Sequence, residues 1–378
     1  MDAENIININ GNKISFEKDE TILEVAKRNS IDIPVLCHLK GATTTGSCQV
    51  CVVEIDGSSD LVTSCSTKAE KGMNIKTESP KVVESRYNTI QKFLSSGNHN
   101  CAISRSDGSD WTSFQMNVQK DDQSKELCPV WGDCELQDLA YRYQVTANPL
   151  KHVPSELPME TANPFIVRDF SRCILCGKCV RACREIQVND AIEFDNPESP
   201  TKIIASSDDK VLKDSDCVFC GECIQVCPVG ALVEKDVRYK IRPRDTEKVR
   251  TTCSYCGVGC QMHLHVKDDK IVKVTGVEGA PPNYGSLCVK GRFGYNFIDS
   301  PERLTTPLIK ENGEFREATW EEAFTHVADN FNRIKKDHGS DSIGVLTSAR
   351  VSNEENYLAN KFTRAVLKTN NIDHCARL

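Results

Sequence analysis

The sequence lacks three features that would place the protein in a membrane, outside the cell or on nucleic acid. No uninterrupted apolar run of 18 residues occurs in the 378-residue chain, so we expect no membrane span. The N-terminal residues Met1–Asn5 include neither a basic region nor an apolar segment, so we expect no signal peptide. A net charge of −7 argues against a nucleic-acid partner. We therefore expect a cytoplasmic protein whose partners are other proteins.

Cysteine, in contrast, is abundant, with 20 residues in the chain. In the reducing cytoplasm, closely spaced cysteines indicate metal ligation rather than disulfide bonds. The spacing of these cysteines changes along the chain, which predicts a multidomain α+β protein with several metal centres.

Two cysteine runs in a predicted domain of residues 165–245 have the spacing C-x2-C-x2-C-x3-C, which is typical of [4Fe–4S] ligation. They are Cys173, Cys176, Cys179 and Cys183, followed by Cys217, Cys220, Cys223 and Cys227. Because the fourth cysteine crosses to the other cluster in two-cluster ferredoxins, we assign Cys227 to the first cluster and Cys183 to the second. The alternative, structural zinc, usually takes its four ligands as two separated pairs, which these runs do not match.

Residues 1–80 are predicted to form a small β-rich domain. Apolar residues on both sides of Asn10-Gly11 indicate a β-hairpin, and the capping box Thr21–Glu24 predicts the start of a helix. Four cysteines with one close pair and two long arms suit a [2Fe–2S] cluster in a β-grasp fold: Cys37, Cys48, Cys51 and Cys65. This pattern resembles the N-terminal ferredoxin domain of the large iron–sulfur subunit of respiratory complex I and of [FeFe]-hydrogenases.

Residues 81–150 are predicted to be helical, with one apolar face formed by Val83, Tyr87, Ile90 and Leu94. The segment also contains His99, Cys101, Cys128 and Cys134. These residues are similar to the [4Fe–4S] domain that follows the β-grasp domain in the same families, and the resemblance implies one histidine and three cysteine ligands. The sequence departs from that pattern, because 26 residues separate Cys101 from Cys128. A solvated loop histidine is the alternative for His99. Residues 148–164, with four prolines, are expected to be a linker.

Residues 246–305 contain a third cysteine group. Cys253, Cys256 and Cys260 need a distant fourth ligand, and Cys288 is the candidate. This motif, which continues to Lys290 and Gly291, resembles the N-terminal [4Fe–4S] domain of the molybdopterin oxidoreductases. The resemblance implies that Lys290 lies between cluster and pterin and helps to pass the electron; an ordinary surface lysine is the alternative. Two strands are expected at 262–266 and 271–274.

Residues 306–378 are predicted to begin an α/β catalytic domain. A capping box at Thr319–Glu322 precedes a helix with an apolar face, a buried strand is expected at Gly344–Leu346, and a helix at Glu354–Leu367. Two α/β units without the rest of a sheet cannot bury both of its faces, so a larger domain is expected.

The segment from Ser348 to Leu378 resembles formate dehydrogenases of the molybdenum/tungsten bis-pterin class. The resemblance implies that Arg350 binds the cofactor and that the metal ligand, cysteine or selenocysteine, comes directly after Leu378. We therefore expect the front part of a selenoprotein, cut at a UGA codon; a genuinely short product is the alternative. Cys375, the one cysteine outside the five ligand groups, is expected to be a small buried residue; contact with the pterin site is the alternative.

These resemblances imply one [2Fe–2S] cluster, four [4Fe–4S] clusters and, in the full-length protein, a molybdenum or tungsten bis-molybdopterin guanine dinucleotide. The full-length protein is expected to interconvert formate and CO2, whereas this chain alone is expected to be inactive on formate. Electrons are expected to pass the Cys253, ferredoxin, His99 and [2Fe–2S] centres to a diaphorase-type partner that carries FMN and reduces NAD. A ferredoxin or hydrogenase partner is also possible.

Three other functions stay open. The electron-input arm of an [FeFe]-hydrogenase does not explain the Cys253–Lys290 motif. A large subunit of complex I is not expected to carry two adjacent four-cysteine ferredoxin runs. A stand-alone electron-transfer subunit is separated from the preferred interpretation by the codon after Leu378.

Overall fold

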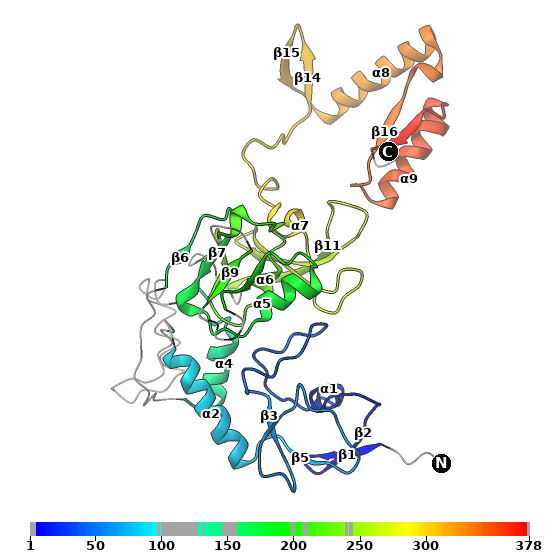
Figure 1. Ribbon diagram of the computed structural model, residues 1–378. Helices are drawn as coiled ribbons and strands as arrows, with labels where there is room; N and C mark the ends of the chain where they lie inside the picture. Colours follow the sequence, from blue (N-terminus) through cyan, green and yellow to red (C-terminus); the bar gives the residue numbers. More distant parts are fainter. Residues whose placement is uncertain are drawn as a thin grey trace. The chain divides into compact units, whose positions relative to one another are not determined.

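The structure is a computed structural model that describes residues 5–96, 99, 128–130, 132–145, 157–196, 198, 200, 202–206, 211–238, 241 and 245–375. The chain divides into two compact units, Met1–Glu247 and Lys248–Leu378 (Figure 1). Across the described ranges, every helix is too short or too polar to cross a lipid bilayer.

The first unit begins with a five-stranded mixed sheet in the order β2-β1-β5-β3-β4. Its elements are β1 (Ile6–Ile9), β2 (Asn12–Ser15), α1 (Ile22–Arg28), β3 (Val52–Ile55), β4 (Val62–Thr63) and β5 (Asn74–Lys76). The predicted hairpin is confirmed: Ile7 pairs with Ile14 across a turn in which Asn10 and Gly11 both have positive φ. The capping box at Thr21 and Glu24 is also confirmed. The β-grasp sheet thus follows from local signals.

Two helices, α2 (Pro80–Ser95) and α4 (Glu135–Arg142), lie side by side after this sheet (Figure 1). The expected apolar face of α2 was partly wrong, because Val83 is 36% exposed whereas Val82 and Arg86 are fully buried. Arg86 donates to the backbone oxygens of Val50 (2.9 Å) and Val52 (2.7 Å). These hydrogen bonds turn α2 so that the charged residue, together with Ile90, faces the protein interior.

The ferredoxin segment contains the three-stranded antiparallel sheet β10-β7-β6 and the hairpin β8-β9. Its elements are β6 (Met159–Glu160), β7 (Ile166–Asp169), η2 (Phe170–Arg172), α5 (Lys178–Arg181), η3 (Ala182–Ile186), β8 (Ile192–Phe194), β9 (Ile203–Ala205), η4 (Leu212–Asp214), α6 (Glu222–Val226) and β10 (Leu232–Glu234). Helices α5 and α6 begin after Gly177 and Gly221, whose φ angles of 69° and 71° only glycine adopts freely. The two cysteine runs therefore start their helices in the same way.

One hydrophobic core joins the three segments of the first unit. It includes Leu36 and Cys37 from the β-grasp sheet, Leu94 from α2, Leu136 from α4 and Val229 from the ferredoxin segment. Because this core is shared, the predicted domains 1–80, 81–150 and 165–245 pack as one compact body.

The second unit begins with the three-stranded sheet β11-β12-β13, and both predicted strands of this segment are confirmed. Its elements are β11 (Glu247–Thr252), β12 (Gln261–Lys267), β13 (Lys270–Gly276), α7 (Val289–Phe293), β14 (Leu308–Glu311), β15 (Glu314–Glu317), α8 (Trp320–His338), η6 (Ser340–Ser342), β16 (Val345–Thr347), α9 (Asn353–Lys361), η7 (Phe362–Leu367) and β17 (Ile372–His374).

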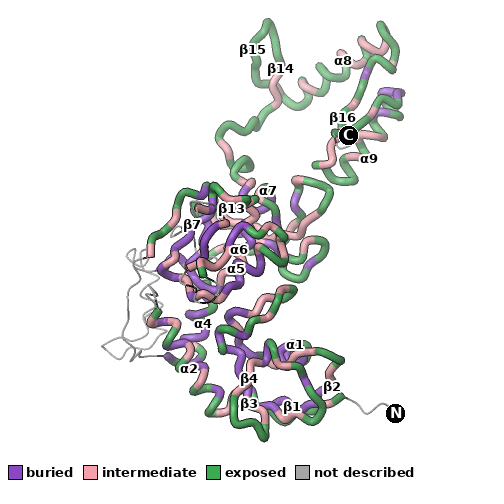
Figure 2. Tube along the Cα trace, in the orientation of Figure 1, coloured by how far each residue is buried: buried purple, intermediate pink, exposed green. Residues whose placement is uncertain are grey.

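The elements from α8 onward bury little of their apolar surface (Figure 2). The expected strand at Gly344–Leu346 is present as β16, but the expectation that it is buried was wrong, since Leu346 is 85% exposed. The physical reason is that β16 and β17 form a two-stranded parallel sheet, which is too small to be covered on both faces. The cap at Thr319 forms only in part: its hydroxyl accepts from Glu322 N, but the Glu322 carboxylate binds Arg316.

Gly276 provides a test of the second unit's packing. A Cβ atom at this position would lie 1.8 Å from the backbone oxygen of Gly285, so Gly276→Ala must push two backbone segments apart. Overpacking of this kind costs about 1–3 kcal/mol. We expect faster hydrogen exchange of the β12 and β13 amides, measured by mass spectrometry. Gly344→Ala is the control, because the nearest atom to its new Cβ lies 3.9 Å away. Equal protection in both variants would contradict this packing.

Candidate metal centres

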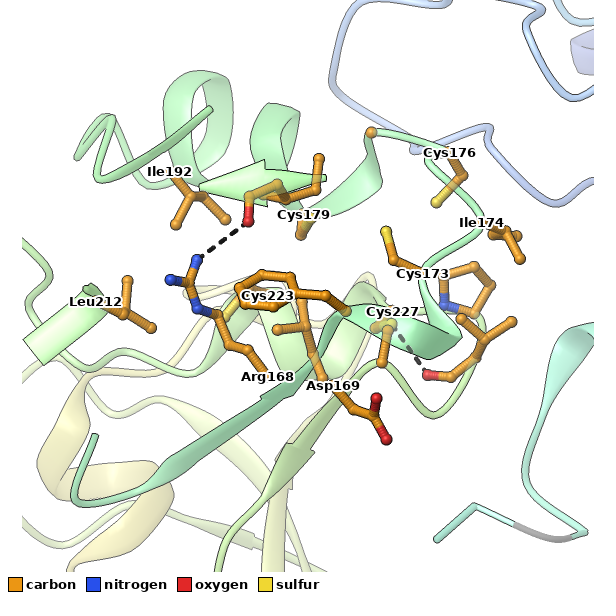
Figure 3. A pocket seen from close by; sticks show the side chains of 17 residues that line it. Arg168, Asp169, Cys173, Ile174, Cys176, Cys179, Ile192, Leu212, Cys223 and Cys227 are labelled. Carbon is orange, nitrogen blue, oxygen red and sulfur yellow. Dashed lines mark hydrogen bonds between the residues drawn. The ribbon is translucent and has the colours of Figure 1, made fainter. Parts of the chain in front are cut away.

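The first ferredoxin run surrounds a cavity inside the first unit. Cys173, Cys176, Cys179 and Cys227 line the cavity, together with Cys223 (Figure 3). Its volume is about 40 Å³, whereas one ordered water needs roughly 10–15 Å³ on the same measure. The four cysteines assigned to one cluster from the sequence therefore meet around a space larger than a packing defect.

The ligand loop before α5 is held by backbone geometry that recurs in the second run. Leu175 and Phe219 both have positive φ, 55° and 54°, which is uncommon for bulky residues. Each N–H donates to the sulfur of a cysteine two residues earlier, Cys173 or Cys217, over 3.4 Å. The unusual backbone angles of both loops orient N–H groups toward sulfur, as expected for sulfur atoms that carry negative charge.

Burial makes these sulfurs poor thiolates on their own. Desolvation raises the pKa of Cys173 to about 11 and that of Cys176 to about 12, and the neighbouring thiol of Cys227 adds to the effect at Cys176. Desolvation also raises the pKa of Cys227 to about 11. Iron binds deprotonated thiolates, and its positive charge stabilises the negative charge that the apolar surroundings disfavour. The donor set and its surroundings therefore fit an iron–sulfur cluster.

The second ferredoxin run surrounds a smaller cavity of about 20 Å³. Its lining includes Cys183, Cys217, Cys220 and Cys223. The amide of Ala191 donates to the sulfur of Cys183 over 3.3 Å, and desolvation raises the pKa of Cys217 to about 11. Because Cys223 lines both cavities, the two candidate centres are close neighbours.

The β-grasp cysteines lie as two sulfur pairs. Cys51 and Cys65 are 3.2 Å apart, and Cys37 shares a hydrogen bond with Cys48. Within each pair the shared hydrogen bond is the largest cause of the pKa shifts: it raises the pKa of Cys48 and of Cys65, where burial adds to it, and lowers the pKa of Cys37 and of Cys51. All four are buried. Two pairs of thiols suit a [2Fe–2S] rhomb, in which each iron takes two.

In the second unit, Cys253 is buried, Cys260 is half-buried, and Cys256 and Cys288 are exposed. Burial, followed by the neighbouring thiols, raises the pKa of Cys253 and of Cys260. Helix α7 lies against this group: a Cβ at Gly291 would be 3.5 Å from the sulfur of Cys253, an ordinary contact distance. Lys290 is exposed on the first turn of α7.

The predicted histidine-ligated centre lies partly outside the described residues. His99, Cys128 and Cys134 are buried, but Cys101 is not among the residues that the structure describes. Cys134 packs in the core shared with Cys37 and lies 3.5 Å from the backbone oxygen of Pro228. The four-ligand set thus stays a prediction. Within the described ranges, no three histidine, cysteine or acidic side chains come together to hold a single metal ion; a cubane cluster instead takes one ligand per iron.

A separate polar cavity of about 310 Å³ opens at the carboxyl ends of β16 and β17. Thr347, Asn356, Asn360 and His374 are among its lining residues, whereas Arg350 is not. In open α/β sheets, ligands bind at this edge of the strands, and Asp373 and His374 are candidate ligand-binding residues on that ground. The expectation of a buried Cys375 was wrong, because it follows the exposed end of β17.

Sequence reasoning also missed two cations on α5. Lys178 is buried and pairs with Glu135 over 3.0 Å, and Arg181 reaches the loop after Cys37. No sequence pattern signals either contact, because each joins residues far apart in the chain. The one signal in the sequence is that both residues lie within two positions of a candidate ligand cysteine.

The four family descriptions that match this chain follow its cysteine groups. They are "2Fe-2S iron-sulfur cluster binding domain" at residues 4–80, "4Fe-4S dicluster domain" at 172–231, "Molybdopterin oxidoreductase Fe4S4 domain" at 246–300 and "Molybdopterin oxidoreductase" at 303–378. The predicted [2Fe–2S], ferredoxin and molybdopterin oxidoreductase segments are therefore confirmed at the level of the domain family.

Curated relatives match the whole chain. It is 32% identical over 420 residues to "Putative formate dehydrogenase YrhE" of Bacillus subtilis (strain 168), which covers 100% of this chain and 40% of the relative. It is 31% identical to "Probable oxidoreductase YjgC" of the same organism, with 100% of this chain and 40% of the relative covered. The chain thus spans about 40% of the length of these relatives.

A solved structure is also similar, the crystal structure of an NAD+-reducing [NiFe]-hydrogenase in the H2-reduced state. The TM-score is 0.52 at 26% sequence identity, covering 63% of this chain and 91% of that one. Together the matches identify a multidomain iron–sulfur protein that carries molybdopterin oxidoreductase domains and is homologous to proteins named as formate dehydrogenases.

Proposed function

We propose that this chain is the electron-transfer part of a formate dehydrogenase. The observation that carries the proposal is the joining of two kinds of segment in one chain. Residues 4–231 carry the iron–sulfur families, and residues 246–378 carry the molybdopterin oxidoreductase families. Homology to proteins named as putative formate dehydrogenases supports formate as the proposed substrate of the full-length protein.

The proposed ligand sets follow the sequence assignment. The [2Fe–2S] cluster takes Cys37, Cys48, Cys51 and Cys65, and the histidine-ligated cluster takes His99, Cys101, Cys128 and Cys134. The first ferredoxin cluster takes Cys173, Cys176, Cys179 and Cys227, and the second takes Cys217, Cys220, Cys223 and Cys183. The fourth [4Fe–4S] cluster takes Cys253, Cys256, Cys260 and Cys288. When bound, these clusters supply one-electron carriers. The chain's own part is to bury the sulfurs, exclude water and aim N–H groups at them.

The contacts of the first unit support a short relay. Arg181 Nη2 donates to the backbone oxygens of both Cys37 and Cys176, and Cys134 lies against Pro228, the residue after Cys227. The first ferredoxin centre therefore has two proposed neighbours, the [2Fe–2S] centre and the His99 centre. A direct step to the [2Fe–2S] centre is proposed beside the route through His99.

The molybdopterin end is proposed to lie in the second unit. The polar cavity beside His374 is at the strand edge where α/β folds bind ligands, and it is lined by hydroxyl and amide groups that suit a pterin. Lys290 is proposed to pass the electron from the metal–pterin centre, molybdenum or tungsten, to the Cys253 cluster. Arg350 is proposed to bind the same cofactor.

The proposed acceptor is NAD, through a diaphorase-type partner that carries FMN. Similarity to an NAD+-reducing hydrogenase over 63% of this chain supports this choice. The same similarity favours a second candidate, the electron-transfer subunit of a hydrogenase, which leaves residues 246–378 unexplained. A cytoplasmic location is part of the proposal, because a reducing compartment keeps the thiols available to iron.

Double mutants test the crossed ligand assignment. After anaerobic reconstitution the chain is expected to bind ~18 irons. Cys173→Ala and Cys227→Ala are each expected to remove about four, and the double mutant no more than either single one, because both ligands serve one cluster. Cys173→Ala combined with Cys183→Ala is expected to remove about eight irons. Iron and sulfide analysis measures the outcome, and the reverse pattern would overturn the assignment.

Formate-dependent dye reduction tests the need for the rest of the protein. The 378-residue chain, reconstituted with iron and sulfide, is expected to give no reduction of viologen by formate, although dithionite still reduces its clusters. Formate activity in this chain would contradict the proposal.

The proposed selenocysteine is tested by the nucleotide sequence: a codon other than UGA after Leu378, or no reading frame beyond it, would refute that part.

A further inference from the structure

One arginine joins the ligand loops of two candidate centres. Arg181, the last residue of α5, is buried, and its guanidinium donates both to the loop that contains Cys37 and to a carbonyl oxygen of its own run. Its Nη1 donates to the backbone oxygen of Thr43 over 2.7 Å. Its Nη2 donates to the backbone oxygen of Cys37 and, over 3.2 Å, to that of Cys176.

These contacts place one fixed positive charge beside a ligand of each centre. All three hydrogen bonds of the guanidinium go to carbonyl oxygens, so their partners carry only partial charges. A buried charge is costly unless opposite charge lies near it. Thiolates and the clusters they hold supply such negative charge on both sides, and arginine stays protonated at every working pH. The carboxylate of Glu185 already interacts with this charge, and anionic centres on both sides would stabilise it further.

The next helical turn makes a second hydrogen bond to the same loop. Glu185, four residues after Arg181, accepts the backbone N–H of Thr43 over 2.5 Å, and this hydrogen bond lowers the pKa of Glu185. Thr43 is thus held through its N–H by Glu185 and through its oxygen by Arg181. Two bonds to one residue fix both the distance and the orientation of the Cys37 loop against α5.

We propose that Arg181 is a positioning residue for electron transfer between the Cys37–Cys65 centre and the Cys173–Cys227 centre. The inference rests on the proposed assignment of these two centres. In the step concerned, one electron leaves the reduced cubane and enters the oxidised [2Fe–2S] cluster, and no proton or bond is exchanged. Arg181 fixes the separation of the two clusters through hydrogen bonds, and its charge favours the more negative, reduced state of each.

The test compares four 378-residue chains, reconstituted anaerobically: wild type, Arg181→Met, Arg181→Lys and Arg184→Met. Arg184 is the matched control, because it lies three residues after Arg181, is exposed, and pairs through its side chain with Asp190 over 2.7 Å. Three quantities are measured: iron content, the midpoint potential of the [2Fe–2S] signal, and the microwave power that half-saturates this signal when the cubane is reduced.

Arg181→Met is expected to keep its iron, shift the [2Fe–2S] potential to more negative values, and lower the half-saturation power at least twofold, because the neighbouring reduced cluster relaxes the signal less. Arg181→Lys keeps the charge but not the forked hydrogen bonds, so the potential is expected to recover while the half-saturation power stays low. Arg184→Met is expected to match the wild type.

Unchanged potential and unchanged relaxation in Arg181→Met would overturn the inference, and so would equal shifts in Arg184→Met. If Arg181→Met loses iron, Arg181→Lys decides: a wild-type relaxation in that variant overturns the positioning role, and a lowered one supports it. A wild-type chain with no [2Fe–2S] or [4Fe–4S] signal would instead refute the cluster assignment itself, and the two failures are thereby distinguished.

Discussion

Buried sulfur is the constraint on which the first unit depends. Cys37, Cys48 and Cys134 are part of its shared hydrophobic core, and Cys51 and Cys65 belong to the core of the β-grasp sheet. In an apolar interior a thiol holds its proton, whereas a thiolate there requires a positive partner. The candidate centres are therefore built into the folding core instead of being placed on a finished surface. Binding of iron and folding of this unit are expected to be coupled for that reason.

The sequence predicted what depends on neighbouring residues. The turn at Asn10 and Gly11 and the cap at Thr21 need only a few adjacent residues, and the ligand runs need only a short loop, so spacing alone indicated them. The buried face of α2 was misplaced because Arg86 satisfies carbonyl groups of a strand more than thirty residues away. A charged residue at the centre of a core cannot be read from apolar periodicity, which counts it as solvent-facing.

The C-terminal elements show a second limit of apolar periodicity, because residues that it predicts to be buried are exposed. Leu346 and Phe324 have the spacing of a core strand and a core helix, yet both are exposed. Periodicity predicts which side of an element is apolar, but the partner that covers it comes from elsewhere. The chain spans about 40% of its relatives' length, and within the described residues β16 pairs only with β17. The polar cavity at the ends of these strands was open to prediction, because strand order alone defines that edge.

The four-residue helix α5 connects three segments of the first unit through its side chains. It contributes the ligand candidate Cys179 and two buried cations that point to different neighbours. Lys178 pairs with Glu135, the residue after Cys134, and Arg181 binds the carbonyl oxygen of Cys37. Glu135 is 47% exposed, so solvent screens the Lys178 pair in part, whereas the hydrogen bonds of Arg181 are buried. The side chains of one helical turn thus connect the first ferredoxin run to the segments that contain Cys37 and Cys134.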